Sequence, residues 1–192
     1  MPFEEMSLLD YAINASLVIS NTAINKYDKA GLIAFNNSIH AILPADRRNN
    51  QMEKIQQSLY KLETGFAEPD YEMVYAFIRR KIRQRSLLIL FTNIESTASL
   101  RRYSNIFGRL AREHVMLVVL FENTEVKNLL DVEAKSLDEI YIKTIAEKFI
   151  LEKKLIAREL NQRGVHTVLT KPAGLSVSLI NSYLEFKSRG II

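Results

Sequence analysis

The chain has 192 residues, of which 47% are hydrophobic and 25% are charged, values that are typical of a folded globular domain and exclude a disordered or fibrous chain. The absence of cysteine excludes a disulfide scaffold, a thiolate zinc site and a cysteine nucleophile. The net charge of +4 is mildly basic, which keeps nucleic acid among the partners to consider.

The N-terminal residues predict a helix followed by a β-hairpin. A capping-box pattern begins the helix at Ser7, and apolar residues then recur at helical spacing. Strands are expected over Leu32–Phe35 and Ile39–Leu43. The short connection Asn36–Ser38 can join only antiparallel neighbours, and Pro44 is expected to end the second strand.

The remaining elements alternate between helices and strands. Helices are expected over Asn50–Leu62, after Asp70, from a cap at Thr97, over Val126–Leu130, from a capping box at Ser136 and around Leu179. Buried strands are expected over Ser86–Thr92, Val115–Phe121 and Val165–Leu169. The long helix after Ser136 places Tyr141, Ile145, Phe149, Ile156 and Leu160 on one side. This order predicts a single α/β domain over residues 1–192, with a doubly wound, mostly parallel sheet and one antiparallel edge strand.

The apolar runs predict strands and no membrane-spanning segment. The longest runs, Leu87–Phe91 and Val115–Phe121, are far shorter than the roughly 20 residues that a transmembrane helix needs. The first residues are acidic where a signal peptide would be basic. We therefore expect a cytoplasmic protein that makes no membrane contact of its own.

The sequence patterns of common catalytic sites do not occur in this chain. There is no Gly-rich phosphate loop, no His-Glu-x-x-His and no G-x-S-x-G nucleophile elbow. The three histidines, His40, His114 and His166, each lie at a strand or its entrance, where histidine is usually a partly buried structural side chain. We expect no catalytic residue and no cofactor, and thus a protein that is not an enzyme.

Oxygen-bearing side chains gather at one place where ligands bind in α/β proteins. Ligands in open sheets bind beyond the carboxyl ends of the strands, where one expected strand delivers Thr92, Asn93, Glu95 and Ser96. Asp70, at the start of another helix, is expected to reach the same edge. Such donors suit Mg²⁺ or Ca²⁺, although the same residues also fit a simple polar turn.

Several segments resemble one bacterial family in their order and spacing. They are Leu9–Ala15, Gly31–Phe35, Glu68–Tyr71, Leu87–Thr92 and Leu179–Arg189. The chain is similar to the von Willebrand factor A-like domain of the family catalogued as domain of unknown function fifty-eight. The resemblance implies a Rossmann-like sheet that binds proteins, often through a metal-ion-dependent adhesion site. It also implies a MoxR-type AAA+ ATPase as partner in chaperone-like assembly, and a membrane-anchored full-length parent.

The chain departs from that family at the metal site. The D-x-S-x-S motif of the first strand is absent, Asp70 stands where the family has threonine, and Asn93 stands where it has aspartate. We therefore expect no tight metal site and at most a weak one for Mg²⁺ or Ca²⁺. The missing first strand would lie between Leu32–Phe35 and Ser86–Thr92, so we expect the C-terminal part of a longer protein whose unpaired strand edges favour self-association.

Taken together, the sequence predicts a non-enzymatic protein–protein interaction module. The expected contact surface is the carboxyl edge of the sheet, at Asp70, Thr92, Asn93, Glu95 and Ser96. One alternative is a nucleic-acid-binding domain that uses the basic helix Arg79–Arg85, although such a charge run is more often a solvated helix face. Another is a hydrolase of unrecognised type, for which no nucleophile is visible.

Overall fold

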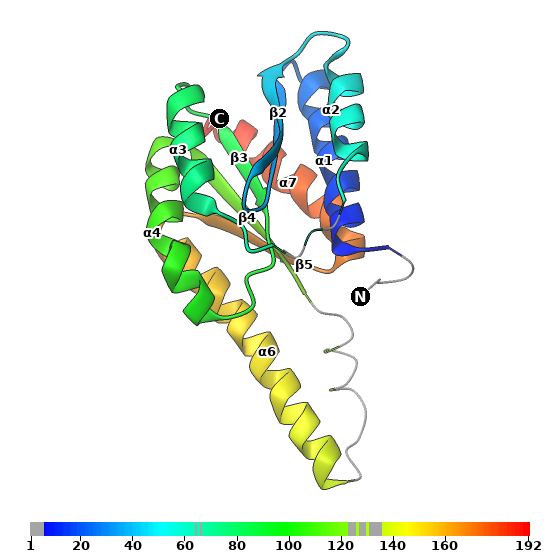
Figure 1. Ribbon diagram of the computed structural model, residues 1–192, viewed down its shortest axis with the longest axis vertical. Helices are drawn as coiled ribbons and strands as arrows, with labels where there is room; N and C mark the ends of the chain where they lie inside the picture. Colours follow the sequence, from blue (N-terminus) through cyan, green and yellow to red (C-terminus); the bar gives the residue numbers. More distant parts are fainter. Residues whose placement is uncertain (1–5, 64, 66, 123–125, 127–129, 131–135) are drawn as a thin grey trace. The chain divides into compact units, whose positions relative to one another are not determined.

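The computed structural model describes residues 6–63, 65, 67–122, 126, 130 and 136–192. Its strands form a three-stranded parallel sheet and a separate two-stranded antiparallel sheet (Figure 1). This arrangement confirms the predicted α/β class and is consistent with a Rossmann-like fold. The chain divides into two compact units, the first made of residues 1–84 and 175–190 and the second of residues 85–174 and 191–192.

The first unit contains the antiparallel hairpin of β1 (Ala30–Phe35) and β2 (Ile39–Asp46), as the short connection predicted. The Asn36 side chain accepts a hydrogen bond from the backbone N–H of Ser38 at 3.0 Å, which closes the turn. The prediction that Pro44 ends the second strand is wrong, because β2 continues to Asp46. A proline lacks only the N–H donor, so a strand with a neighbour on one side tolerates it.

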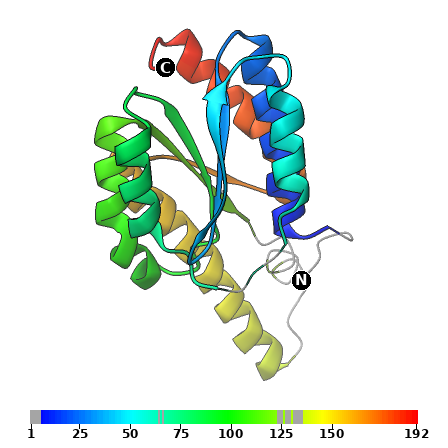
Figure 2. The ribbon, with the colours of Figure 1, turned by 45° about the horizontal axis from the view of Figure 1, so that its top comes forward.

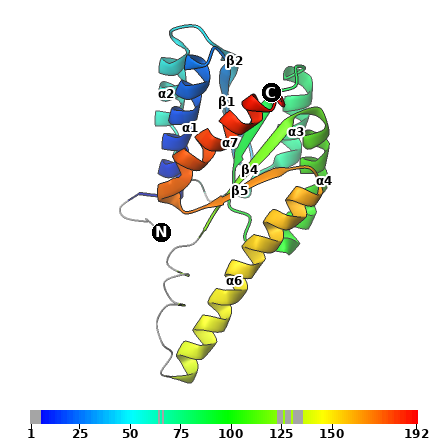
Figure 3. The same cartoon turned by 180° about the vertical axis from the view of Figure 1, so that it is seen from behind.

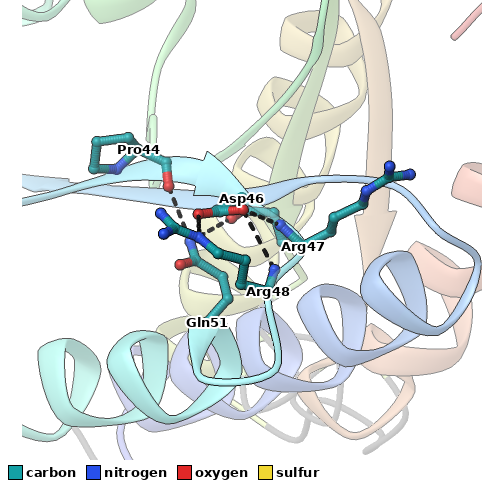
Figure 4. A network of polar contacts seen from close by, with 6 residues as sticks. Pro44, Asp46, Arg47, Arg48 and Gln51 are labelled. Atoms are coloured by element: carbon teal, nitrogen blue, oxygen red, sulfur yellow. Dashed lines mark hydrogen bonds and ion pairs between the residues drawn. The ribbon is translucent and has the colours of Figure 1, made fainter.

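A buried glutamine joins this hairpin to the helix that follows it (Figure 4). The Gln51 side chain is 2% exposed, and its Nε2 donates to the carbonyl oxygens of Ala30 at 2.7 Å and Pro44 at 2.9 Å. Asp46 accepts hydrogen bonds from the backbone N–H groups of the next two residues at 2.7 and 3.3 Å. The polar groups at the irregular end of the hairpin are thereby paired, as burial requires.

Four helices complete the first unit: α1 (Leu8–Asn25), α2 (Gln51–Tyr60), α3 (Tyr71–Lys81) and α7 (Leu175–Ser188). The predicted capping box at Ser7 is present at the start of α1. Figure 2 shows α1 and α2 beside the hairpin, and both helices pack against its strands. The buried residues of this core are Ala30, Ile55 and Leu59, with partly buried Ile13, Leu17, Ile24, Leu32, Leu43 and Leu62 around them.

A polar cluster links the end of α1 to α7, two segments at opposite ends of the chain. The Tyr183 hydroxyl and the Lys187 ammonium both donate hydrogen bonds to the Asp28 carboxylate, and Lys187 also donates to the carbonyl oxygen of Lys26 at 3.1 Å. Partial burial acts to raise the pKa of Asp28, but the two hydrogen bonds and the lysine charge bring it below its ordinary value. The cluster thus favours a charged Asp28 and ties α7 to the N-terminal helix.

The second unit contains the parallel sheet, in the order β3 (Leu87–Phe91), β4 (Val115–Phe121) and β5 (His166–Thr170). The connections are α4 (Thr97–Glu113) and α6 (Leu137–Gln162), and a short 3-10 turn over 172–174 follows β5. Two right-handed crossovers in the same direction place both helices on one face of the sheet, where they pack against each other. Every residue of β4 is buried, as its continuous apolar sequence predicted.

β3 is the edge strand of this sheet and is only partly buried along its whole length. The N–H of Thr92 donates to Val119, and the N–H of Val115 donates to Ser86, so the even-numbered residues of β3 face β4. The odd-numbered residues then direct their N–H and C=O groups away from β4. The two strands expected to flank a missing strand, β1 and β3, belong to different sheets. The helix expected over residues 126–130 lies largely outside the described residues.

Candidate functional site

The carboxyl end of β3 continues into a polar loop that starts α4. Ser96 rather than the expected Thr97 caps this helix, with extended backbone angles and a side chain that accepts the N–H of Ser99 at 3.1 Å. The backbone N–H of Thr92 remains in the sheet ladder, since it donates to the carbonyl oxygen of Val119 at 3.3 Å. The loop therefore contains Thr92, Asn93, Glu95 and Ser96, four of the five residues that the sequence proposed for a site.

A lysine from α6 holds this loop. The Lys153 ammonium donates to the side-chain oxygen of Asn93 at 2.7 Å and to the carbonyl oxygen of Ile94 at 2.8 Å. Ile94 is itself buried, and the Asn93 amide nitrogen lies 3.5 Å from a carboxylate oxygen of Glu95. These contacts join residues that are 59 and 60 positions apart in the sequence. Lys153 belongs to no motif, so the sequence did not indicate its place in this loop.

The Lys153 contact bears directly on cation binding at Asn93. Burial lowers the pKa of Lys153, while the nearby charge of Glu95 acts to raise it. An ammonium group on the Asn93 oxygen places a positive charge where the sequence offered oxygen donors to a metal ion. A divalent cation that binds the same oxygen would have to displace the Lys153 ammonium or tolerate its repulsion. This arrangement supports the expectation that any metal site here is weak.

Glu152, the residue before Lys153, contacts the start of α4. The backbone N–H of Thr97 donates to a Glu152 carboxylate oxygen at 2.9 Å. A carboxylate is favourable at this position because the first N–H groups of a helix lack intrahelical partners and carry partial positive charge. Glu152 and Lys153 together attach the middle of α6 to the loop at the carboxyl end of β3.

Asp70 lies in the first compact unit, apart in the chain division from the other four predicted residues. Its side chain caps α3 by accepting the N–H of Met73 at 2.9 Å, and its own N–H donates to the Asn36 carbonyl oxygen at 2.9 Å. The next residue, Tyr71, packs edge-on against Phe35. These contacts explain Asp70 as a helix cap, and its contribution to a shared site stays a prediction.

Helix α6 (Leu137–Gln162) exposes many apolar side chains, most of them in its first half. More than half of the large hydrophobic residues that are exposed in the described part of the chain lie on this helix. We call them the α6 apolar surface: Leu137, Ile140, Tyr141, Ile142, Ile145, Phe149, Leu151 and Leu155. The sequence placed Tyr141, Ile145 and Phe149 on the same side of the helix as Ile156 and Leu160, and these three residues are 69%, 38% and 48% exposed.

The exposed half of α6 lies beyond its attachment to the sheet. Glu152 and Lys153 contact the loop after β3, and roughly four turns of helix, about 22 Å, precede them. Figures 1 and 3 show this half of α6 extending away from β4 and β5. The second half packs normally, since Ile156 and Leu160 are fully buried. All residues of the α6 apolar surface except Leu155 thus precede the contact with the loop that carries Asn93.

The three histidines lie where the sequence placed them, in β2, before β4 and at the start of β5. His114 is 2% exposed, and neither ring nitrogen has a hydrogen-bond partner among the residues that the structure describes. Burial lowers the pKa of His114, the Glu113 charge acts to raise it, and the Arg85 charge lowers it further. His114 is therefore held neutral as part of the core.

The residues that the structure describes contain neither a metal-binding cluster nor a membrane-spanning helix. Among them, no group of three or more histidine or carboxylate side chains is arranged to hold a metal ion. Within the same residues, none of the helices combines the length and the apolar character needed to cross a bilayer.

Comparison with known proteins adds no relative from which a function could be transferred. No protein-family model, no curated protein and no solved structure matches this chain. The similarity to a von Willebrand factor A-like domain accordingly remains a prediction from the sequence segments, and the site must be interpreted from its own chemistry.

Proposed function

We propose that this chain is a non-enzymatic protein-interaction module that binds a partner through the α6 apolar surface. The observation that carries the proposal is the exposure of Ile142, Ile145 and Phe149 on a well-formed helix. Exposed apolar side chains are ordinary when they occur singly. A contiguous group of them on a soluble helix face usually marks a surface that a partner covers.

The helical register shows that the main exposed apolar residues of α6 share one face of the helix, as an interaction surface requires. At about 100° per residue, Tyr141, Ile142, Ile145 and Phe149 fall within an arc of about 100°. The buried Ile156 continues the same stripe in the second half of the helix. One stripe therefore serves the internal core at one end and is available to another protein at the other end.

The loop after β3 supplies polar groups next to this surface. Asn93 and Glu95 are exposed and lie where Lys153 attaches α6 to the loop. An apolar centre with polar groups at its margin is the usual composition of a protein interface. The partner that the sequence resemblance supplies is a MoxR-type AAA+ ATPase, with which the chain would act in chaperone-like assembly.

The proposal can be tested by placing a photo-crosslinking amino acid at Phe149 in the protein expressed in its source cell. The matched control places it at Tyr60, which is 90% exposed in the first unit and lies outside the α6 apolar surface. We expect a defined heteromeric adduct from position 149 and none from position 60. Identification of that adduct as an AAA+ ATPase would support the proposed partner.

Two results would contradict the proposal. Equal adduct patterns from both positions would show that exposure alone determines crosslinking. An adduct made only of two copies of the chain would assign the α6 apolar surface to self-association, and light scattering of the purified protein would then show a dimer or larger species.

A further inference from the structure

The outer face of α4 carries a group of exposed arginines that the packing of this helix does not explain. The helix has four arginines and no lysine, and Glu113 is its first acidic residue. Its inner face is buried and consists of Leu100, Ser104, Ile106, Phe107 and Leu110. The four exposed arginines lie opposite, within an arc of about 100°. We define the α4 arginine face as Arg101, Arg102, Arg109 and Arg112.

Most of the α4 arginine face lacks acidic partners within the described residues. Just after α6 and just after α7, an arginine pairs with a glutamate one turn earlier, with nitrogen–oxygen distances of 3.3 and 2.8 Å. No such ion pair joins Arg101, Arg109 or Arg112 to a described carboxylate, and even Glu113, four residues after Arg109, does not pair. Like charges one turn apart oppose helix formation, so helix stability does not explain the arrangement.

The surface between the guanidinium groups is low and open. Ala98 and Asn105 are exposed on the same side of the helix. A Cβ atom added to Gly108 would meet no atom within 4 Å. Arg102 is held against Tyr103, with its guanidinium 5.3 Å from the ring centroid and a nitrogen donating to the hydroxyl at 3.1 Å. A partner segment can therefore approach the helix backbone between the arginine side chains.

We propose that the α4 arginine face binds an acidic segment of a partner protein, with carboxylates distributed over about 16 Å, the rise between Arg101 and Arg112. Charge complementarity favours an anionic partner, because no ion pair joins Arg101, Arg109 or Arg112 to a described carboxylate. Protein interfaces are enriched in arginine and tyrosine and depleted of lysine, which matches α4. The planar guanidinium also binds a carboxylate through two parallel hydrogen bonds. This surface is separate from the α6 apolar surface, and the proposal does not depend on it.

The test measures binding of a labelled helical peptide with glutamates at alternating three- and four-residue spacing to the full chain at low salt. Single-stranded and duplex DNA of similar total charge serve as competing probes. One variant carries Arg101→Glu, Arg109→Glu and Arg112→Glu, and a second carries lysine at the same three positions. A control carries Arg79→Glu and Arg80→Glu, which reverse two exposed charges on α3.

We expect the peptide affinity to fall at least about tenfold in the glutamate variant and severalfold in the lysine variant, which keeps charge but loses the planar fork. The α3 control should bind the peptide as the wild type does. Peptide binding that survives charge reversal on α4 would overturn the proposal. DNA binding that is tighter than peptide binding and unchanged in the lysine variant would assign this face to phosphates instead. The lysine variant also decides the matter if the glutamate variant fails to fold.

Discussion

The two halves of α6 share one helical register but have opposite surroundings. In the second half, Ile156 and Leu160 are fully buried in the parallel-sheet unit. In the first half, Ile145 and Phe149 continue the apolar pattern and remain exposed. Glu152 and Lys153 mark the boundary, where they contact the loop after β3. Apolar periodicity therefore predicts which side of a helix is apolar, but the tertiary structure decides whether other elements cover that side.

The largest difference between the halves should appear in stability. Ile156→Ala removes a fully buried side chain and leaves a cavity, so we expect it to lower the free energy of unfolding by about 2–5 kcal/mol. Ile145→Ala makes the same chemical change where the side chain is exposed, and we expect less than about 1 kcal/mol. Urea unfolding of both variants measures the contrast. Equal losses would mean that the first half of α6 is packed in solution.

Much of the fold followed from local sequence signals. The hairpin was predictable because only a tight turn fits Asn36–Ser38, and β4 was predictable because its apolar run is unbroken. The capping residues Ser7 and Ser136 also lie at the predicted helix starts. These features depend on residues that are close together in the chain, where spacing and backbone chemistry leave few alternatives.

The candidate site was predictable only in part, because its main contacts are distant in sequence. The loop residues around Asn93 followed from the end of a strand. The contact of Lys153 with this loop could not be predicted, because most lysines on a helix are simply exposed to solvent. The exposure of Tyr141 and Phe149 did not follow from the sequence, because their spacing matches that of the buried Ile156. Spacing alone contains no information on where the underlying sheet stops.

A substitution at the boundary between the two halves of α6 should lower the free energy of unfolding by an intermediate amount. Lys153→Met keeps most of the side-chain length but removes the donors to Asn93 and Ile94, so we expect a loss of about 1–3 kcal/mol in the free energy of unfolding. Lys154→Met, next to it and exposed, is the matched control and should cost less than about 0.5 kcal/mol. Hydrogen exchange of the loop should accelerate only in the Lys153 variant. A stable, protected loop in that variant would show that the contact does not hold it.

The free energy of unfolding should also depend on pH through the buried His114. Its folded-state pKa lies below the unfolded value of 6.5, because burial disfavours the charged ring. As the pH falls below about 6.5, the unfolded chain gains the proton first, so the free energy of unfolding should decrease until the folded-state pKa is passed. Well above the unfolded value of 6.5, the histidine is neutral in both states and should have no effect on the free energy of unfolding. Denaturant unfolding between pH 7.5 and 5 measures it.

The matched control for this pH effect is His40→Gln, since His40 is exposed in β2. That variant should keep the acid-side decrease of the wild type. His114→Gln should reduce the decrease, whatever its effect on stability at neutral pH. An unchanged pH dependence in His114→Gln would assign the decrease to other groups.

The smallest expected effect is that of divalent cations on the loop beside the exposed half. The Lys153 ammonium already occupies the Asn93 oxygen, so calorimetric titration with Mg²⁺, Ca²⁺ and Mn²⁺ should show no binding tighter than about millimolar. Lys153→Met should bind these ions somewhat better if the ammonium opposes them. Micromolar binding that Asp70→Ala abolishes would contradict the expectation.

One affinity measurement shows whether the exposed half of α6 binds the partner. The partner captured through position 149 is titrated against the wild-type chain and against a variant with Ile145→Ser and Phe149→Ser. A control with Tyr60→Ser and Val177→Ser changes two apolar residues of the first unit that are more exposed than Ile145 and Phe149. We predict at least about tenfold weaker binding for the α6 variant alone, with melting temperature preserved in both. Undiminished affinity of the α6 variant would contradict the claim that this surface binds the partner.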